Sequence, residues 1–91
     1  MVAQWPKTGV YRLRPLTMAR AIDHQMFVVC CNSCGNTYGD GGNSAVIDPY
    51  GKTIVLAGET EEIIYAECDL QMMAMLREKV PMFRERRPEL Y

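Results

Sequence analysis

Apolar residues recur every three or four positions in the first third of the chain, at Val10, Leu13, Leu16, Ala19 and Ile22. This spacing is typical of an amphipathic helix and predicts one over residues 11–25. Pro15 limits where that helix begins, because proline is tolerated only in the first helical turn. We therefore expect the regular helix to run from about Arg14 to Gln25.

A short apolar run, MFVVCCN at residues 26–32, follows this helix. Its β-branched composition predicts a strand buried on both faces. Residues 35–42, GNTYGDGG, combine four glycines with Asn and Asp and predict a flexible surface loop. Two β-type runs, 44–47 and 52–56, flank the turn signal DPYG and predict a hairpin.

The C-terminal third contains one more apolar run, IIYAECD at residues 63–69, which we expect to form a strand. Asp69 is the expected N-cap of a second helix over Leu70–Lys79, which Pro81 ends. The tail, MFRERRPELY, has no periodicity, so we expect it to be frayed or docked on another structure.

This order of elements predicts an α/β domain, in which helices cover a sheet. A strand that is apolar on both faces needs layers on both sides, and the chain offers few elements to supply them. The 91 residues therefore look like part of a larger sheet or of an oligomer.

The composition of the chain limits which binding partners and which cellular compartment we expect. The chain has 10 Lys plus Arg against 11 Asp plus Glu, which gives no electrostatic reason to expect nucleic acid or an anionic membrane as a partner. Its apolar runs are far shorter than the roughly 20 residues that cross a bilayer. The N-terminal segment MVAQWPKTG lacks the features of a secretory signal, so we expect a cytoplasmic, reducing compartment and free thiols.

Three of the four cysteines lie in the stretch VVCCNSCGN, which raises the question of a metal or thiol site. Zinc at Cys31 and Cys34 would need two more ligands, and only His24 and Cys68 are available outside any paired motif. A redox CxxC is expected at a helix N-terminus, whereas this one follows a strand. The zinc site is kept as an alternative.

A nucleophilic cysteine would need a nearby base, and the lone His24 has no evident partner. The favoured interpretation is that Cys30 and Cys31 are small apolar residues that pack a strand. His24 is expected to satisfy carbonyl groups in the last turn of its helix. From the residues alone, we assign no catalytic residue, no metal ligand and no cofactor.

The segment ARAIDHQMFVVCCN resembles a stretch of the nitrilase superfamily, ARAIENQ followed by VV and N. These carbon-nitrogen hydrolases act on nitriles and amides. Four further segments match the family in the same order: AQWP, GGNSAVIDPYG, EEIIYAECDL and REKVPMFRERRPELY. The chain is most similar to the amidase branch that includes the omega-amidases. Asp23-His24 departs from the usual Glu-Asn, and Asn43 stands where His is common.

The resemblance implies a fold and partners. The family fold is a four-layer α-β-β-α sandwich, of which this chain would form the C-terminal portion as one partial domain, residues 1–91. Family subunits pair through helices that include the one matching Arg14–Gln25, and the tail often reaches over a partner. We therefore expect a homo-oligomer or binding to a full-length relative. A non-catalytic assembly module is the alternative function.

The resemblance also implies which chemistry this chain lacks. In the family a Cys attacks the C–N carbon, a Glu moves protons and a Lys stabilises the tetrahedral intermediate, and all three precede the segment that matches Ala3–Pro6. The usual context of the nucleophile, Cys-Tyr-Asp followed by Arg-Phe-Pro, does not occur here. The chain alone is expected to be inactive, with a small amide as substrate only in a complete enzyme.

One pair of candidate site residues can be carried over from the family. The AQWP segment ends a core strand at the edge of the substrate pocket in the family, so Gln4 and Trp5 are expected to line that pocket. Simple core packing is the alternative for Trp5.

Overall fold

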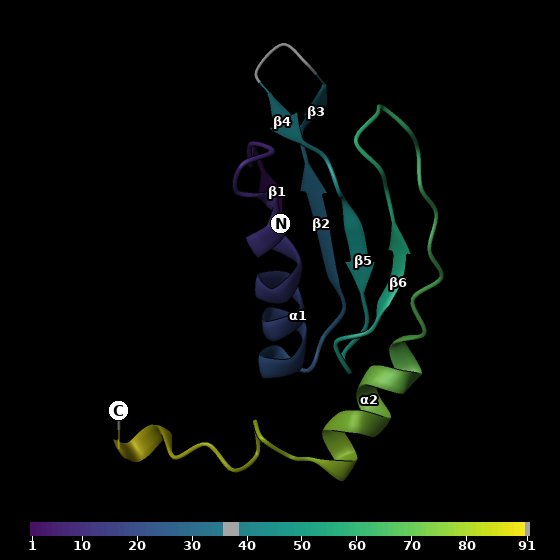
Figure 1. Cartoon of the computed structure of the whole chain (residues 1–91). Coiled ribbons are helices and arrows are strands. Elements are labelled where there is room, and N and C mark those ends of the chain that lie inside the picture. The colour runs from purple at the N-terminus through teal and green to yellow at the C-terminus, as the bar shows by residue number, and fades with distance from the viewer. Residues whose placement is uncertain (36–38, 91) are drawn as a thin grey trace.

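A four-stranded sheet forms the centre of the molecule. The computed structural model describes residues 1–35 and 39–90. The sheet has the order β1-β2-β5-β6, with β1 parallel to β2 and the other pairs antiparallel. Its strands are β1 (Val2–Ala3), β2 (Val28–Asn32), β5 (Ala45–Ile47) and β6 (Thr53–Leu56). The remaining elements are η1 (Val10–Arg12), α1 (Leu13–His24), the hairpin β3 (Cys34–Gly35) and β4 (Asp40–Gly41), α2 (Leu70–Lys79) and η2 (Pro88–Leu90) (Figure 1).

Helix α1 begins and ends within one residue of the prediction. Pro15 is its third residue, where the missing N–H group costs no helical hydrogen bond. Gln25 ends the helix in the left-handed conformation, at φ 49° and ψ 51°. The backbone N–H of Gln25 donates to Ile22 O, and that of Met26 donates to Ala21 O at 3.2 Å. This pair of bonds is the Schellman motif, which satisfies carbonyl groups at a helix end.

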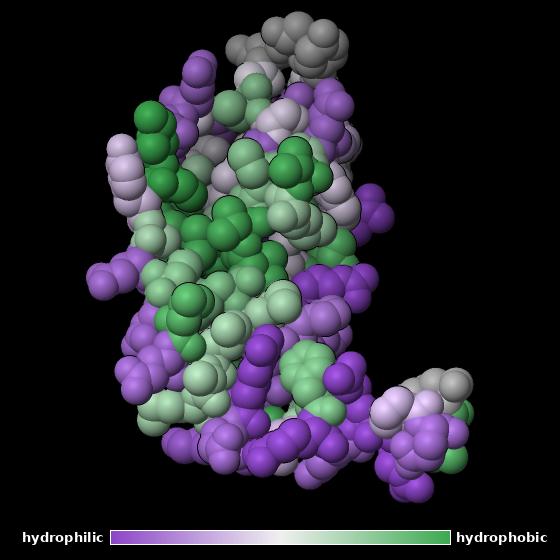
Figure 2. Space-filling model, turned by 180° about the vertical axis from the view of Figure 1, so that it is seen from behind, coloured by the Kyte–Doolittle hydropathy of each residue, from purple (hydrophilic) through white to green (hydrophobic). Residues whose placement is uncertain are grey.

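The core lies between α1 and the sheet. Ala21 of α1 packs against Ala45 and Ile47 of β5, with Met18 and Val28 partly buried beside them. Side chains of β2 alternate: Cys30 and Asn32 are buried, whereas Val29 is 57% exposed and Cys31 is exposed. The prediction that this strand is buried on both faces is therefore wrong, because among residues 1–35 and 39–90 a helix layer covers one side of the sheet and leaves the other open. The face in Figure 2 carries a broad apolar region over its middle.

The predicted hairpin is confirmed as β5 and β6, joined by the DPYG turn. The Asp48 carboxylate accepts hydrogen bonds from the backbone N–H groups of Tyr50 and Lys52, both at 2.9 Å. Gly51 adopts φ 86°, a left-handed conformation that glycine enters without steric cost. Local turn chemistry thus fixes the connection that the sequence indicated.

The predicted strand over residues 63–69 is wrong. This segment forms no ladder with the sheet, and Figure 1 shows it running back beside β6 as an unpaired stretch. Ile63 and Tyr65 are 79% and 84% exposed. A strand requires backbone partners on a neighbour, so its β-type composition alone does not produce one.

The predicted surface loop over residues 35–42 is partly wrong. Residues 36–38 lie outside the described residues. Asp40, Gly41 and Gly42 are buried rather than exposed, and Asp40–Gly41 forms β4. A Cβ atom at Gly41 would lie 2.7 Å from the Cβ of Val10, so the glycine permits close packing against η1.

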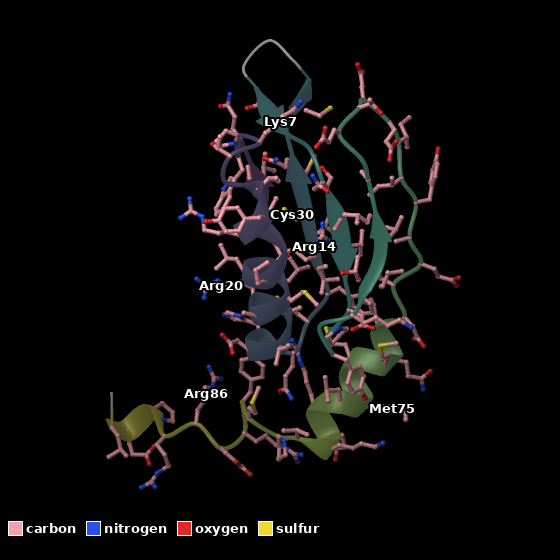
Figure 3. The ribbon with its side chains drawn as sticks, in the orientation of Figure 1. Lys7, Arg14, Arg20, Cys30, Met75 and Arg86 are labelled. Carbon is pink, nitrogen blue, oxygen red and sulfur yellow. The ribbon has the colours of Figure 1, made fainter. Side chains whose placement is uncertain are left out.

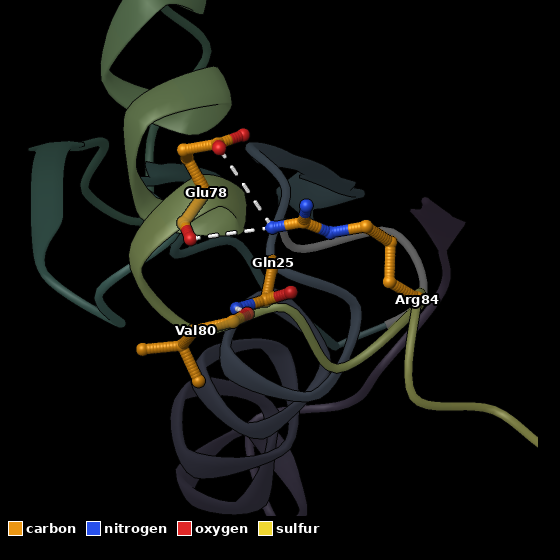
Figure 4. Close-up of polar contacts among 4 residues, drawn as sticks. All are labelled: Gln25, Glu78, Val80 and Arg84. Carbon is orange, nitrogen blue, oxygen red and sulfur yellow. Dashed lines mark hydrogen bonds and ion pairs between the residues drawn. The ribbon is translucent and has the colours of Figure 1, made fainter.

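Helix α2 has the predicted bounds, and the Asp69 carboxylate accepts a hydrogen bond from the Gln71 N–H at 3.0 Å. It buries no residue. Its attachment to α1 is polar: the Arg77 Nε donates to Gln25 O at 3.0 Å, and the Gln25 Nε2 donates to Val80 O at 2.8 Å. Figure 4 shows Gln25 beside Val80, together with Arg84, whose guanidinium lies 3.8 Å from the Glu78 carboxylate. Among the described residues, no helix is long and apolar enough to cross a membrane.

Candidate functional site

The side chain of Asn32, at the end of β2, joins three segments of the chain. Its Oδ1 accepts a hydrogen bond from the Trp5 N–H at 2.7 Å. Its Nδ2 donates to Trp5 O at 3.2 Å and to Gly42 O at 2.8 Å. The Asn32 N–H donates to the Ser44 Oγ at 2.9 Å, and that hydroxyl donates to Asn32 O at 3.2 Å. We call Trp5, Asn32, Gly42 and Ser44 the Asn32 cluster.

Asn32 is only 5% exposed, so its polar groups depend on these partners. A buried amide whose donors and acceptor are paired fixes its neighbours firmly, because losing a partner would leave an unsatisfied polar group. The cluster therefore holds the AQWP segment, the end of β2 and residues 42–44 together at one end of the sheet.

Gln4 and Trp5 lie at this end of the sheet. Gln4 is exposed and Trp5 is half-buried. The Trp5 ring has the Arg12 guanidinium 6.0 Å from its centroid, and Trp5 O also accepts from the Gly41 N–H at 2.9 Å. Neither residue lines the hollow described next, so their role in a substrate pocket stays a prediction.

A hollow of about 260 Å³ lies beside the Asn32 cluster. Asn32, Gly42 and Ser44 form one wall, and the segment after β6 forms the other. The remaining lining residues are Cys31, Ser33, Cys34, Ala57, Gly58, Thr60, Glu61, Glu62 and Ile64. Amide, hydroxyl and carboxylate groups can hydrogen-bond a small polar molecule there, which is the usual role of the few polar groups in a binding hollow.

The cysteines do not form a catalytic or metal centre in the part of the chain that the structure describes. Cys30 is 2% exposed, and burial raises the pKa of its thiol, while the N-terminal amino group and Arg14 oppose that rise. Burial thus disfavours the thiolate that a nucleophile requires. Cys31 is exposed and Cys34 half-buried.

The zinc alternative has no ligand set. Over residues 1–35 and 39–90, no three His, Cys, Asp or Glu side chains lie close enough to hold a metal ion. The Nδ1 of His24 lies 3.0 Å from Arg20 O, and because a carbonyl only accepts, this nitrogen carries the hydrogen. The interpretation of His24 as a helix-end residue is confirmed.

Sequence reasoning missed the residues that build this end of the sheet. Asn32, Ser44 and Arg14 were not singled out for their contacts, although a polar residue ending an apolar run was a usable signal for Asn32. Arg14 projects from α1 toward the sheet, and its Nη2 donates to Asn43 O at 3.1 Å (Figure 3). Gly42 and Asn43 both adopt left-handed φ angles, 63° and 62°.

Comparison with known proteins gives one consistent result. Residues 1–78 match the family model described as carbon-nitrogen hydrolase. The chain is 40% identical over 91 residues to the 2-oxoglutaramate amidase of Bacillus subtilis, covering 98% of this chain and 35% of that protein. It is 40% identical over 87 residues to the omega-amidase NIT3 of Saccharomyces cerevisiae, covering 92% of this chain and 30% of that protein.

Solved structures agree with the sequence comparison. The crystal structure of the yeast protein, a member of branch 10 of the nitrilase superfamily, superposes with a TM-score of 0.77 over 88% of this chain and 31% of that one. A CN-hydrolase superfamily protein of Xanthomonas campestris, with an arsenic adduct in its active site, superposes with a TM-score of 0.83. It is 29% identical, and the match covers 92% of this chain and 33% of that one. The chain spans about a third of the length of the curated relatives it matches.

Proposed function

This chain belongs to the carbon-nitrogen hydrolase family, and we propose that it forms the C-terminal portion of an omega-amidase-like enzyme. The observation that carries the proposal is the 40% identity to a 2-oxoglutaramate amidase along 98% of the chain. The proposed reaction is hydrolysis of a small amide through a cysteine thioester. The Glu, Lys and Cys of that reaction would come from outside these 91 residues.

The proposed role of the chain is to supply a wall of the pocket and an assembly surface. In support of this, burial raises the pKa of the Cys30 thiol and so disfavours the thiolate that a nucleophile requires. The Asn32 cluster and its hollow offer hydrogen-bonding groups instead. We infer that the 91-residue chain is inactive alone.

The exposed apolar side of β2 supports the proposal of a partial fold. Over the described residues, the chain supplies one helix layer and one four-stranded sheet, which would be two of the four layers of the sandwich. Val29 is left 57% exposed although it lies in the middle of a sheet. Covering such a side chain with a second sheet would be favourable by about 25 cal/mol for each Å² of apolar area buried.

A hybrid enzyme tests the proposal. The matching third of the Bacillus subtilis amidase is replaced by these 91 residues, and ammonia release from 2-oxoglutaramate is measured. We expect activity in the hybrid and none in the 91-residue chain alone. The control is the same hybrid with its family nucleophile changed to Ala, which must abolish activity.

Two outcomes would contradict the proposal. One is a hybrid that folds and assembles like its parent yet releases no ammonia. The other is ammonia release by the 91-residue chain itself, lost when one of its four cysteines is replaced.

The assembly module is the second candidate, and the extended shape of the chain favours it. The radius of gyration is 15.3 Å, against about 12 Å expected for a compact chain of this length. Figure 1 shows α2 and the tail reaching away from the sheet. We propose self-association, or binding to a full-length relative, through the Arg14–Gln25 helix and the tail. Sedimentation velocity showing a monomer at every concentration, with no binding to a full-length relative, would count against this.

A further inference from the structure

We propose that Arg14 is a positioning residue that holds the bend at Gly42 and Asn43 and thereby shapes the hollow beside the Asn32 cluster. The proposal rests on the proposed amidase function, since it assigns a role in substrate binding to this hollow. It concerns a residue of α1 that does not line the hollow itself.

The bend is an unusual piece of backbone. Gly42 and Asn43 are consecutive and both left-handed, a conformation that Asn tolerates better than other non-glycine residues but that two consecutive residues seldom share. A Cβ atom at Gly42 would lie 2.5 Å from Gly58 O, so only glycine fits there. Backbone strain of this kind persists only where the surroundings hold it in place, and it gathers at functional sites.

Hydrogen bonds from several elements hold the bend. The Gly42 N–H donates to Ser33 O at 2.9 Å, and the Asn43 N–H donates to Gly58 O at 3.0 Å. Asn32 donates to Gly42 O, as described above. The Arg14 Nη2 donates a hydrogen bond to the Asn43 carbonyl at 3.1 Å, so a charged donor also holds the bend.

The surroundings of Arg14 indicate that it holds geometry rather than adding stability. Its Nη1 is buried and has no hydrogen-bond partner in the part of the chain that the structure describes. A buried charged donor without an acceptor is unfavourable. Figure 3 shows Arg14 directed toward the sheet near Cys30, whereas Arg20 of the same helix points away from it. The guanidinium therefore lies in an energetically unfavourable environment. Among the described residues, its hydrogen bond is to the bend.

The bend connects Arg14 to the hollow. Gly42 precedes Asn43 and Ser44 follows it, and both neighbours line the hollow. The Ser44 Oγ is also hydrogen-bonded to Asn32. A shift of the Asn43 carbonyl would therefore move two groups of the wall together. Misplacing binding groups by about 1 Å is enough to reduce catalysis by up to about 100-fold.

Kinetics of the hybrid amidase test the proposal. We expect Arg14→Met to lower kcat/KM for 2-oxoglutaramate by about 10- to 100-fold, mainly through a higher KM. Arg14→Lys, which keeps the charge and a hydrogen-bond donor group, should restore part of that loss. The control is Lys52→Met, which removes a basic side chain from the β5–β6 turn at the other end of β5 and should leave both constants unchanged.

Hydrogen exchange of the same variants supplies a second readout that does not need activity. The backbone amides of residues 41–44 should exchange at least several-fold faster in Arg14→Met, and at the parent rate in Lys52→Met. A hybrid without the Arg14 change that folds and assembles but releases no ammonia would refute the proposed function, while the exchange rates would still decide the role of Arg14. If Arg14→Met does not fold, Arg14→Gln replaces it, since Gln keeps a donor but loses the charge.

The proposal is overturned if exchange at residues 41–44 and KM both stay at parent values in Arg14→Met and Arg14→Gln. It is also overturned if Arg14→Lys is as impaired as Arg14→Met while both variants lose thermal stability equally. That result would make Arg14 a residue of general stability, with no specific effect on the bend.

Discussion

The two parts of this chain, residues 1–57 and residues 58–90, differ in how they are stabilised. Every buried residue that the structure describes lies at or before Ala57. The first part contains the sheet and α1, whereas the second contains α2 and the tail and buries no residue. Yet α2 has the bounds that the sequence predicts. The difference shows that a helix can be specified by local signals where no core exists to stabilise it.

The local signals are specific. Asp69 accepts the Gln71 N–H at the start of α2, and Pro81 lies just beyond its end. The segment just before it, residues 63–69, has β-type composition but no backbone partner, and it forms no strand. Helical hydrogen bonds are made within one segment, whereas a strand depends on its neighbour.

Core truncation should give the largest difference between the two parts. Leu13 is 1% exposed, so Leu13→Ala removes a packed side chain and leaves a cavity, with an expected loss of about 2–5 kcal/mol in the free energy of unfolding. Leu76 of α2 is half-buried, and Leu76→Ala should cost less than about 1 kcal/mol. Urea denaturation followed by circular dichroism measures both. Equal losses would show that α2 belongs to the same cooperative core.

The polar contact between α1 and α2 offers the next largest effect. Arg77→Met removes the bonds from its guanidinium to Gln25 O and His24 O, and should destabilise the docking of α2 by about 1–3 kcal/mol. Amides of residues 70–79 should then exchange faster, while those of β5 keep their protection.

Arg86→Met is the matched control for this change. The guanidinium groups of Arg77 and Arg86 both lie over the Phe83 ring, 5.2 and 5.3 Å from its centroid. Among the described residues, Arg86 donates a hydrogen bond to Phe83 O and to no residue of α1. Exchange in residues 70–79 should stay at the parent rate. If Arg77→Met behaves like this control, packing rather than the polar contact holds α2.

The same contrast explains how much of the fold the sequence could predict. Helix α1, the β5–β6 hairpin and α2 follow from periodicity, turn residues and caps, all of which act over a few neighbouring positions. The burial of Gly41 was missed because it depends on close approach to Val10, about thirty positions earlier, which no local pattern records.

The candidate site was only partly predictable for the same reason. Trp5 was singled out by its family segment, but its partner Asn32 lies 27 positions away. Arg14 and Asn43 are 29 positions apart and meet only after the sheet has formed. Long-range polar contacts leave no periodic signal, so residue types alone could not connect these side chains.

Cys30 should make the stability of the packed part, residues 1–57, depend on pH. Burial raises the pKa of this thiol above its ordinary value of 9.0, so the unfolded chain ionises first as pH rises. The contribution of Cys30 is therefore present below pH 9 and is lost as pH rises above it. Urea midpoints between pH 8 and pH 10.5 should fall more steeply in the parent than in Cys30→Ala. Parallel curves would show that Cys30 is not protected from ionisation.

The smallest expected effect concerns the ion pair that bridges the two parts. Lys7 Nζ lies 3.8 Å from the Glu59 carboxylate, and the two side chains are 51% and 59% exposed. Solvent screens such a pair, so Lys7→Gln should change the free energy of unfolding by less than about 1 kcal/mol, and by less still in 1 M salt. Urea denaturation of Lys7→Gln, Glu59→Gln and the double variant measures the coupling between them. A coupling well above this range would mean that residues 58–90 are held to the sheet by charge, and that the two parts are less independent than their burial indicates.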